Sequence, residues 1–353
     1  MIQVESIKRF GPRKRLAAAG LLLSGAFALG GILHLGGQDG ASLARADRMA
    51  LDRMLLERAP LSAPFIDVSR QALPAQTHKQ RQATVPEMDV VAASSVADLN
   101  DAFERASFEL SEVRGGTAAV PRLYVTGLPE DLHVVQEIDG RKRAFLRAVL
   151  PLVLLANEEL RERRQLLKEI LALRRHGERL SVDDRAWLDA AAEHYKADPG
   201  DSEELLRRID EVPVSLALAQ AIVESGWGTS RFAREGNALF GQRAGAGSAS
   251  GMAARDASEV RVASFADLMD SVRSYMHNLN THRAYQELRS LRAEQRDRGI
   301  APQGYHLAGA LSRYAEVDDY IGKLRGLIKG NQLAELENAR LASNQRHGGT
   351  RLR

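Results

Sequence analysis

A run of ten residues, 214–223, is apolar on nearly every face of the helix that it predicts. A helix without a polar face must be covered on all sides, so this segment requires several other elements around it. Pro213 suits the first turn, and Gly226 and Gly228 indicate where the helix ends. Glu224 stands at this end, where the helix dipole and an apolar surround both raise the pKa of a carboxyl group. The sequence therefore predicts a buried central helix that ends in a protonated acid.

Glu224 has the chemistry that cleavage of a glycosidic bond needs. A carboxylic acid that stays protonated near neutral pH can give its proton to the leaving oxygen. Gln220 lies one turn earlier on the same face, and Trp227, one of two tryptophans in the chain, follows in the turn. A solvated carboxylate is the usual role of a glutamate at a helix end. The buried helix and its glycine-rich, aromatic turn favour the catalytic interpretation here.

The remaining fold signals are mainly helical. Four further segments have the composition and spacing of helices: 141–173, 183–196, 265–280 and 319–328. Pro151 should kink or divide the first of them, because proline lacks a backbone donor and crowds the preceding turn. Strand signals are confined to 120–125 and to 259–263, the latter with a partner within 242–253. The predicted class is α+β, mainly α, with one small β element.

The N-terminus has the order of a membrane-targeting segment. Residues 1–15 are basic and precede twenty residues, 16–35, without Asp, Glu, Lys or Arg. A helix of that length covers the hydrocarbon core of about 30 Å. We therefore expect a signal anchor at 16–36 in the inner membrane, or a cleaved signal peptide and a secreted chain. Either interpretation leaves residues 1–15 cytoplasmic and the bulk of the chain on the periplasmic or cell-envelope side.

Composition divides the rest of the chain and excludes several functions. Prolines among Gln, Ser, Thr and Ala predict a largely disordered tether at 37–119, with a short helix near 97–113 that could dock. The folded domain is expected at 120–332 and a basic tail at 333–353. The net charge of +3 comes from the two ends, while the middle is net negative, so nucleic acid is not an expected partner. The sequence gives no signal of oligomeric state.

Thiol and metal chemistry are also not expected. The chain has no cysteine, which excludes a thiol nucleophile and a cysteine-rich zinc site. His277 and His282 are five residues apart and so do not share a helix face, which argues against a zinc pair. No cofactor is predicted, because protonation by a carboxyl group needs none.

Two motifs carry a resemblance to a known family: AQAIVESGWGTS at 219–230 and NALFG at 237–241. They resemble the glucosaminidase domain of glycoside hydrolase family 73, and within it the branch of bacterial Bax proteins. The similarity extends through 142–158, 271–285 and 311–324, so it covers about residues 120–332. It implies a lysozyme-like fold with a small β-hairpin lobe. It also implies an endo-β-N-acetylglucosaminidase that cleaves the β-1,4 bond after N-acetylglucosamine in peptidoglycan glycan strands.

The resemblance also implies roles for individual residues. Glu224, in the ESGWG motif, carries over as the general acid. Tyr314 aligns with the tyrosine of a Tyr-Ala-Thr-Asp pattern and would position the sugar, although Glu316-Val317 replaces Thr-Asp here. Asn237 and Phe240 are expected to line the sugar groove by hydrogen bonding and stacking, with Gln220 nearby. Trp227 would either shape this site or pack in the core.

The second catalytic group is left open by the sequence. The family implies a carboxylate on the β element, which makes Glu259 the first candidate and Asp256 the next. Each is equally expected as a solvated hairpin charge, and the acetamido group of the substrate could replace both. Two other functions also remain: a lytic transglycosylase with one catalytic Glu that leaves an anhydro sugar end, and a noncatalytic wall-binding scaffold.

Overall fold

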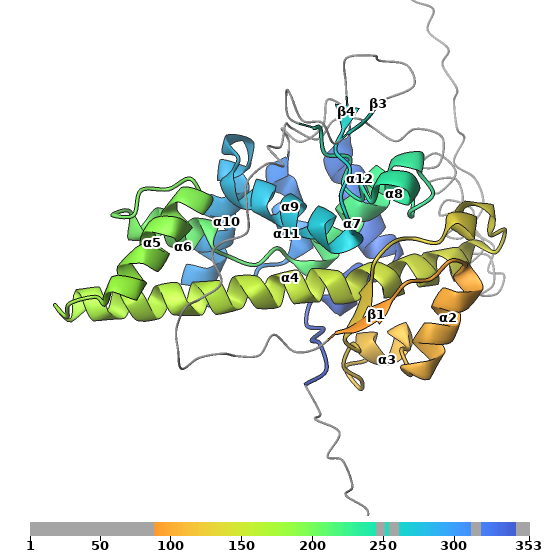
Figure 1. Ribbon diagram of the computed structural model, residues 1–353, viewed down its shortest axis with the longest axis horizontal. Coiled ribbons are helices and arrows are strands. Elements are labelled where there is room, and N and C mark those ends of the chain that lie inside the picture. The colour runs from red at the N-terminus through yellow and green to blue at the C-terminus, as the bar shows by residue number, and fades with distance from the viewer. Residues whose placement is uncertain (1–87, 245–250, 254–260, 312–318, 344–353) are drawn as a thin grey trace, which may run out of the picture. The chain divides into compact units, whose positions relative to one another are not determined.

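The computed structural model describes residues 88–244, 251–253, 261–311 and 319–343 (Figure 1). The longer helices are α2 (Val96–Arg105), α4 (Ile138–Arg175), α5 (Val182–His194), α7 (Val214–Ser225), α9 (Leu268–Thr281), α10 (Gln286–Asp297) and α12 (Tyr320–Gly330). The shorter ones are α3 (Leu110–Arg114), α6 (Ser202–Arg208), α8 (Arg231–Gly236) and α11 (Gly304–Leu307). Four 3-10 turns are η1 (Glu130–Val134), η2 (Arg283–Tyr285), η3 (Ala308–Leu311) and η4 (Leu333–Leu336). The described residues thus form a mainly helical α+β fold, as predicted, consistent with a lysozyme-like glucosaminidase.

The described strands form two small sheets. β1 (Asp89–Val91) pairs in parallel with β2 (Leu123–Val125), and β3 (Met252–Ala253) pairs antiparallel with β4 (Arg261–Val262). Arg243 adds an isolated antiparallel bridge to Val262. The pairing expected between 259–263 and a partner within 242–253 is therefore confirmed for the described residues.

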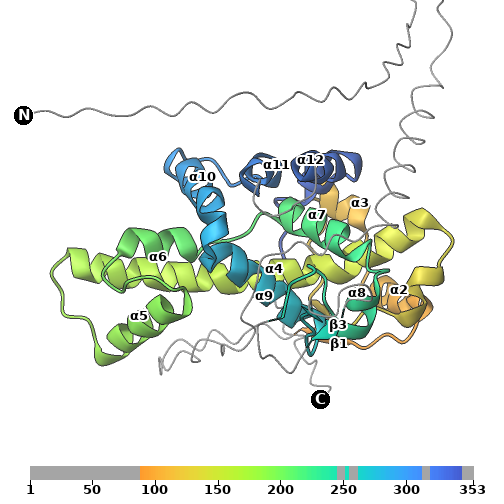
Figure 2. The ribbon, with the colours of Figure 1, turned by 90° about the horizontal axis from the view of Figure 1, so that it is seen from above.

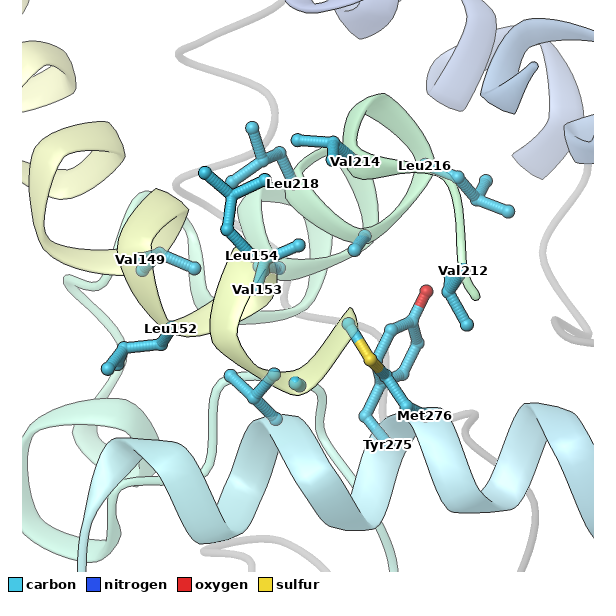
Figure 3. Close-up of a cluster of buried hydrophobic side chains, with 14 of the residues drawn as sticks. Val149, Leu152, Val153, Leu154, Val212, Val214, Leu216, Leu218, Tyr275 and Met276 are labelled. Atoms are coloured by element: carbon cyan, nitrogen blue, oxygen red, sulfur yellow. The ribbon is translucent and has the colours of Figure 1, made fainter. Parts of the chain in front are cut away.

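Helix α7 lies at the centre, as its sequence predicts. Every residue from Val214 to Ser225 is buried, and α4, α11, α12 and η4 pack against the helix. Figures 1 and 2 show α7 between α4 and α12. Figure 3 shows Leu154 of α4 beside Leu218 of α7, within the buried cluster that also includes Met276 of α9. Burial of each such aliphatic side chain stabilises the fold by about 1.5–3 kcal/mol. The helix ends at Gly226, whose φ of 58° is the left-handed conformation that glycine adopts without strain.

Helix α4 runs without interruption through Pro151, so the prediction that this residue could divide the helix is wrong. Proline in a helix interior removes one backbone hydrogen bond, at a cost of about 3 kcal/mol. In α4 every residue from Ala144 to Asn157 is buried, so packing on all sides offsets that cost. The sequence around Pro151 shows the missing donor, whereas the stabilising neighbours come from distant parts of the chain.

The folded part begins before residue 120, which corrects the predicted tether for residues 88–119. Ser95 caps the N-terminus of α2: its hydroxyl accepts from the Asp98 backbone N–H, while the Asp98 carboxylate accepts from the Ser95 N–H. Phe103 is fully buried and meets Phe108 edge to face, with ring centroids 5.8 Å apart. The Arg147 guanidinium of α4 lies over the Phe103 ring at 4.5 Å from its centroid. These apolar anchors dock the segment on α4; residues 37–87 lie outside the described residues.

The fold also continues past residue 332, which corrects the predicted tail for residues 333–343. Helical turn η4 packs against α7, and Leu333 and Leu336 are fully buried. Val120 forms a parallel bridge with Leu341, and the Arg122 side chain donates to the Ala342 carbonyl at 2.8 Å. Residues 344–353 lie outside the described part of the chain.

No helix in the described ranges is both long and apolar enough to cross a membrane. The predicted anchor, residues 16–36, lies outside those ranges and stays a prediction.

Candidate functional site

Glu224 is a buried acid in the last turn of α7. Only 4% of the surface of this residue is exposed. Tyr320 donates a hydrogen bond of 3.1 Å to Oε1, and Oε2 has no hydrogen-bond partner among the described residues. Burial raises the pKa of Glu224 to about 8, and the hydrogen bond from Tyr320 opposes part of that rise. The rise in pKa expected from the sequence is confirmed, and at neutral pH the carboxyl group keeps its proton.

Three buried side chains form a hydrogen-bonded chain that ends at Glu224. The Tyr275 hydroxyl of α9 donates to Gln220 Oε1 at 2.6 Å. Gln220 Nε2 donates to the Tyr320 hydroxyl oxygen at 3.1 Å, and Tyr320 in turn donates to Glu224. Burial raises the pKa of both tyrosines well above its ordinary value, so both remain neutral hydroxyls at physiological pH. Gln220, predicted near the substrate, instead contacts the acid through Tyr320.

The NALFG motif places a backbone turn against the acid. Gly241 has a φ of 58°, and a Cβ at this position would lie 3.0 Å from Glu224 Oε2. Glycine is therefore needed here both for its conformation and for the space that the carboxyl oxygen occupies. Phe240 is fully buried and stacks on Tyr275, with ring centroids 3.8 Å apart and planes 5° apart.

The ring of Phe240 thus packs in the core behind the hydrogen-bonded chain. A fully buried ring has no free face for a sugar, so the predicted stacking role of Phe240 is corrected to a packing role. Asn237 caps α8 with a φ of 52°, and its Nδ2 donates to the carbonyls of Phe265 and Ala266, each at 3.2 Å. This amide ties two loops together, and the expected contact with a sugar stays a prediction.

Trp227 packs in the core, which is one of the two roles that the sequence left open for it. It is 1% exposed and meets Phe145 of α4 edge to face, with ring centroids 5.9 Å apart. The Lys142 ammonium lies 5.2 Å from its ring centroid. The aromatic turn after Glu224 therefore fixes α7 on α4.

Three predicted site residues, Glu259, Asp256 and Tyr314, lie outside the described residues. The sequence reasoning missed Tyr275 and Tyr320 as members of the site. Both occur in segments similar to the glucosaminidase family, and both are tyrosines on otherwise apolar helix faces. A buried tyrosine hydroxyl needs a polar partner, so a tyrosine on an apolar helix face indicates a polar group nearby in the core. In the described ranges, no group of three or more His, Cys, Asp or Glu side chains could hold a metal ion.

One family of known proteins matches the part of the chain that holds these residues. Residues 201–333 match the Glucosaminidase family, described as mannosyl-glycoprotein endo-beta-N-acetylglucosaminidase. The matched range contains Glu224, Gln220, Tyr275 and Tyr320. The resemblance carried by the ESGWG and NALFG motifs is thereby supported by a match over residues 201–333, and this match supports a glycan hydrolase.

A particular relative is Protein bax of Escherichia coli (strain K12), which is 34% identical to this chain over 173 residues. The alignment covers 47% of this chain and 60% of that protein. No solved structure matches the chain significantly.

Proposed function

We propose that this protein is a peptidoglycan hydrolase that cleaves the β-1,4 bond after N-acetylglucosamine, with Glu224 as the general acid. The observation that carries the proposal is a carboxyl group buried at the end of α7, with a pKa raised to about 8, inside the segment that matches the glucosaminidase family. A general acid must hold its proton at the working pH and release it in the transition state. An ordinary exposed glutamate would already be ionised at neutral pH.

In the proposed reaction the Glu224 carboxyl group gives its proton to the glycosidic oxygen as the bond from that oxygen to the anomeric carbon breaks. The bonding electrons leave with the oxygen, and positive charge develops on the sugar ring. Glu224 becomes a carboxylate, which the hydrogen bond from Tyr320 stabilises. Water then adds to the anomeric carbon and its released proton restores the carboxyl group. Glu259 or the substrate's acetamido group is proposed to support the developing charge, and Tyr314 to position the sugar.

We also propose that the protein acts at the cell envelope. The support is the sequence order alone: a basic N-terminus followed by an uncharged run of twenty residues. An anchor at 16–36 would hold the catalytic domain on the side of the membrane where peptidoglycan lies. Fractionation of cells that produce the full chain tests this proposal. Detergent-dependent release from inner membranes is the expected result, and recovery in the cytoplasm would contradict it.

Analysis of digestion products tests the proposed reaction. Purified sacculi are incubated with the full-length protein in detergent micelles, with Glu224→Gln, and with Glu235→Gln as a matched control. Glu235 is an exposed residue of α8 whose carboxylate pairs with Arg231 at 3.5 Å. We expect new reducing N-acetylglucosamine ends from the wild type and the control, and a loss of at least about 100-fold in Glu224→Gln.

The chain ends also distinguish the alternatives. Anhydro-muramic ends would identify a lytic transglycosylase instead. Absence of cleavage by the folded wild-type protein would favour a wall-binding scaffold.

A further inference from the structure

We propose that Tyr320 is a positioning residue that keeps the proton of Glu224 on Oε2, and that Gln220 and Tyr275 fix the direction of the Tyr320 hydroxyl. This inference rests on the proposed role of Glu224 as the general acid. It assigns to three buried side chains a task in the reaction that packing alone does not require.

The direction of each hydrogen bond follows from the amide of Gln220. An amide oxygen can only accept and an amide nitrogen can only donate. The Tyr275 hydroxyl therefore gives its proton to Gln220 Oε1, at 2.6 Å. The Tyr320 oxygen accepts from Gln220 Nε2, at 3.1 Å, and its own proton is donated to Glu224 Oε1, also at 3.1 Å. Each hydrogen bond in the series from Tyr275 through Gln220 and Tyr320 is thus donated in the direction of Glu224.

This direction decides which oxygen of Glu224 carries the proton. Oε1 accepts from Tyr320, so the proton of the neutral carboxyl group resides on Oε2. Oε2 has no hydrogen-bond partner among the described residues, and Gly241 places no side chain against it. The oxygen that holds the proton is thus a buried atom whose proton is not shared with any described side chain. Once the proton is transferred, the same Tyr320 hydroxyl donates to a carboxylate, where a hydrogen bond is stronger.

The described surroundings of Glu224 contain no competing charge. The ionisable groups that act on it are Tyr320 of α12, Tyr275 of α9 and Tyr285 of η2. Burial raises the pKa of each of these tyrosines, so all three are neutral. No Asp, Glu, Arg, Lys or His in the described ranges contributes to the pKa of Glu224. A change in Glu224 on removal of one hydroxyl is therefore attributable to that hydroxyl.

Tyr320→Phe in the full-length protein tests the proposal. Infrared difference spectra against Glu224→Gln isolate the Glu224 carboxyl band across a pH titration. Loss of the hydrogen bond to Oε1 should move the protonated carbonyl stretch to higher frequency. The pKa of Glu224 should rise, because the hydrogen bond favours the charged form. With peptidoglycan as substrate, kcat should fall about 10-fold with little change in KM.

A matched control and a second variant keep the test decisive. Tyr195 is also a fully buried tyrosine, but it makes no contact with Glu224, so Tyr195→Phe should leave the carboxyl band in place. Gln220→Met removes the amide donor to Tyr320 but leaves a side chain of similar size. It should shift the band in the same direction as Tyr320→Phe but less.

The infrared outcome is separate from the outcome for the proposed function. A Glu224 band and pKa unchanged in both Tyr320→Phe and Gln220→Met would overturn the positioning role even if the enzyme cleaves peptidoglycan. If the wild type cleaves no peptidoglycan, the proposed function fails while the shift of the band still tests the orientation of the proton. Should Tyr320→Phe not fold, as judged by thermal unfolding, the Gln220→Met spectrum decides.

Discussion

The carboxyl group of Glu224 destabilises the fold at any pH where it would ionise in water. Its pKa of about 8 in the folded chain stands above the ordinary value of 4.5, so the folded state holds a proton that the unfolded state has lost between these two values. Stability should therefore fall as the pH rises from about 4.5 to about 8. The penalty reaches on the order of 4 kcal/mol at pH 8.

Glu224→Gln should remove this dependence on pH. We expect the variant to gain stability relative to the wild type as the pH is raised from 5 to 8, because its amide does not titrate. Urea denaturation of both proteins at several pH values measures the difference. A difference in free energy of unfolding that is the same at pH 5 and pH 8 would show that the folded carboxyl group titrates normally.

Gly241 is the second residue whose identity the site requires. Gly241→Ala should lower the free energy of unfolding by about 1–2 kcal/mol because of its positive φ. It should also reduce activity, because the added Cβ would lie 3.0 Å from Glu224 Oε2. Gly326 of α12 is the matched control, since a Cβ there meets nothing within 4 Å. Gly326→Ala should be neutral or stabilising by up to about 1 kcal/mol. Equal effects of the two substitutions would contradict this account.

Local signals explain which site residues the sequence could predict. Glu224 was predictable because an apolar helix, its glycine stop and the acid lie within a dozen positions of one another. The partnership of Tyr320 with Gln220 joins residues 100 positions apart, and no periodicity encodes it. Phe240 was assigned to the sugar groove because motif similarity does not report which face of a ring is covered, and Tyr275 covers it.

At the scale of elements, the N-terminal segment with β1, α2 and α3 is part of the fold through a few apolar anchors. Phe103→Ala should cost about 3–5 kcal/mol, because it leaves a cavity next to Phe108 and removes the ring beneath Arg147. Val90→Ala on β1 is the control, since Val90 is 70% exposed and its loss should change stability by less than about 0.5 kcal/mol. Thermal denaturation of both variants measures the effect. A Phe103→Ala protein as stable as the control would mean that α2 is not docked.

Element prediction succeeded where one pattern dominates a segment. Helices α5, α7, α9 and α12 occur where their spacing predicts them, with ends shifted by a few residues. The short helix expected near 97–113 occurs as α2 and α3, but the segment was placed in the tether because its composition was averaged with the proline-rich residues before it. The break predicted at Pro151 is wrong for the opposite reason: the local tendency of proline to end a helix is outweighed by burial of the surrounding turns of α4.

At the scale of the molecule, the folded domain should be larger than residues 120–332, the range that resembles the family. A fragment of residues 88–343 should fold with a higher melting temperature than one of residues 120–332. The shorter fragment lacks β1, α2, α3 and η4, and with them several fully buried side chains. Circular dichroism on both fragments provides the comparison. Equal melting temperatures would indicate that the outer elements do not stabilise the core.

The dependence of the hydrolysis rate on pH tests the central claim most directly, because that claim is that a neutral, buried Glu224 supplies the proton. Release of reducing ends from peptidoglycan by the full-length protein is measured across the pH range. The account predicts an alkaline limb with a midpoint near pH 8, where Glu224 loses its proton, and no such limb in the residual activity of Glu224→Gln. A rate that already falls near pH 4.5, or an alkaline limb that persists in Glu224→Gln, would contradict it.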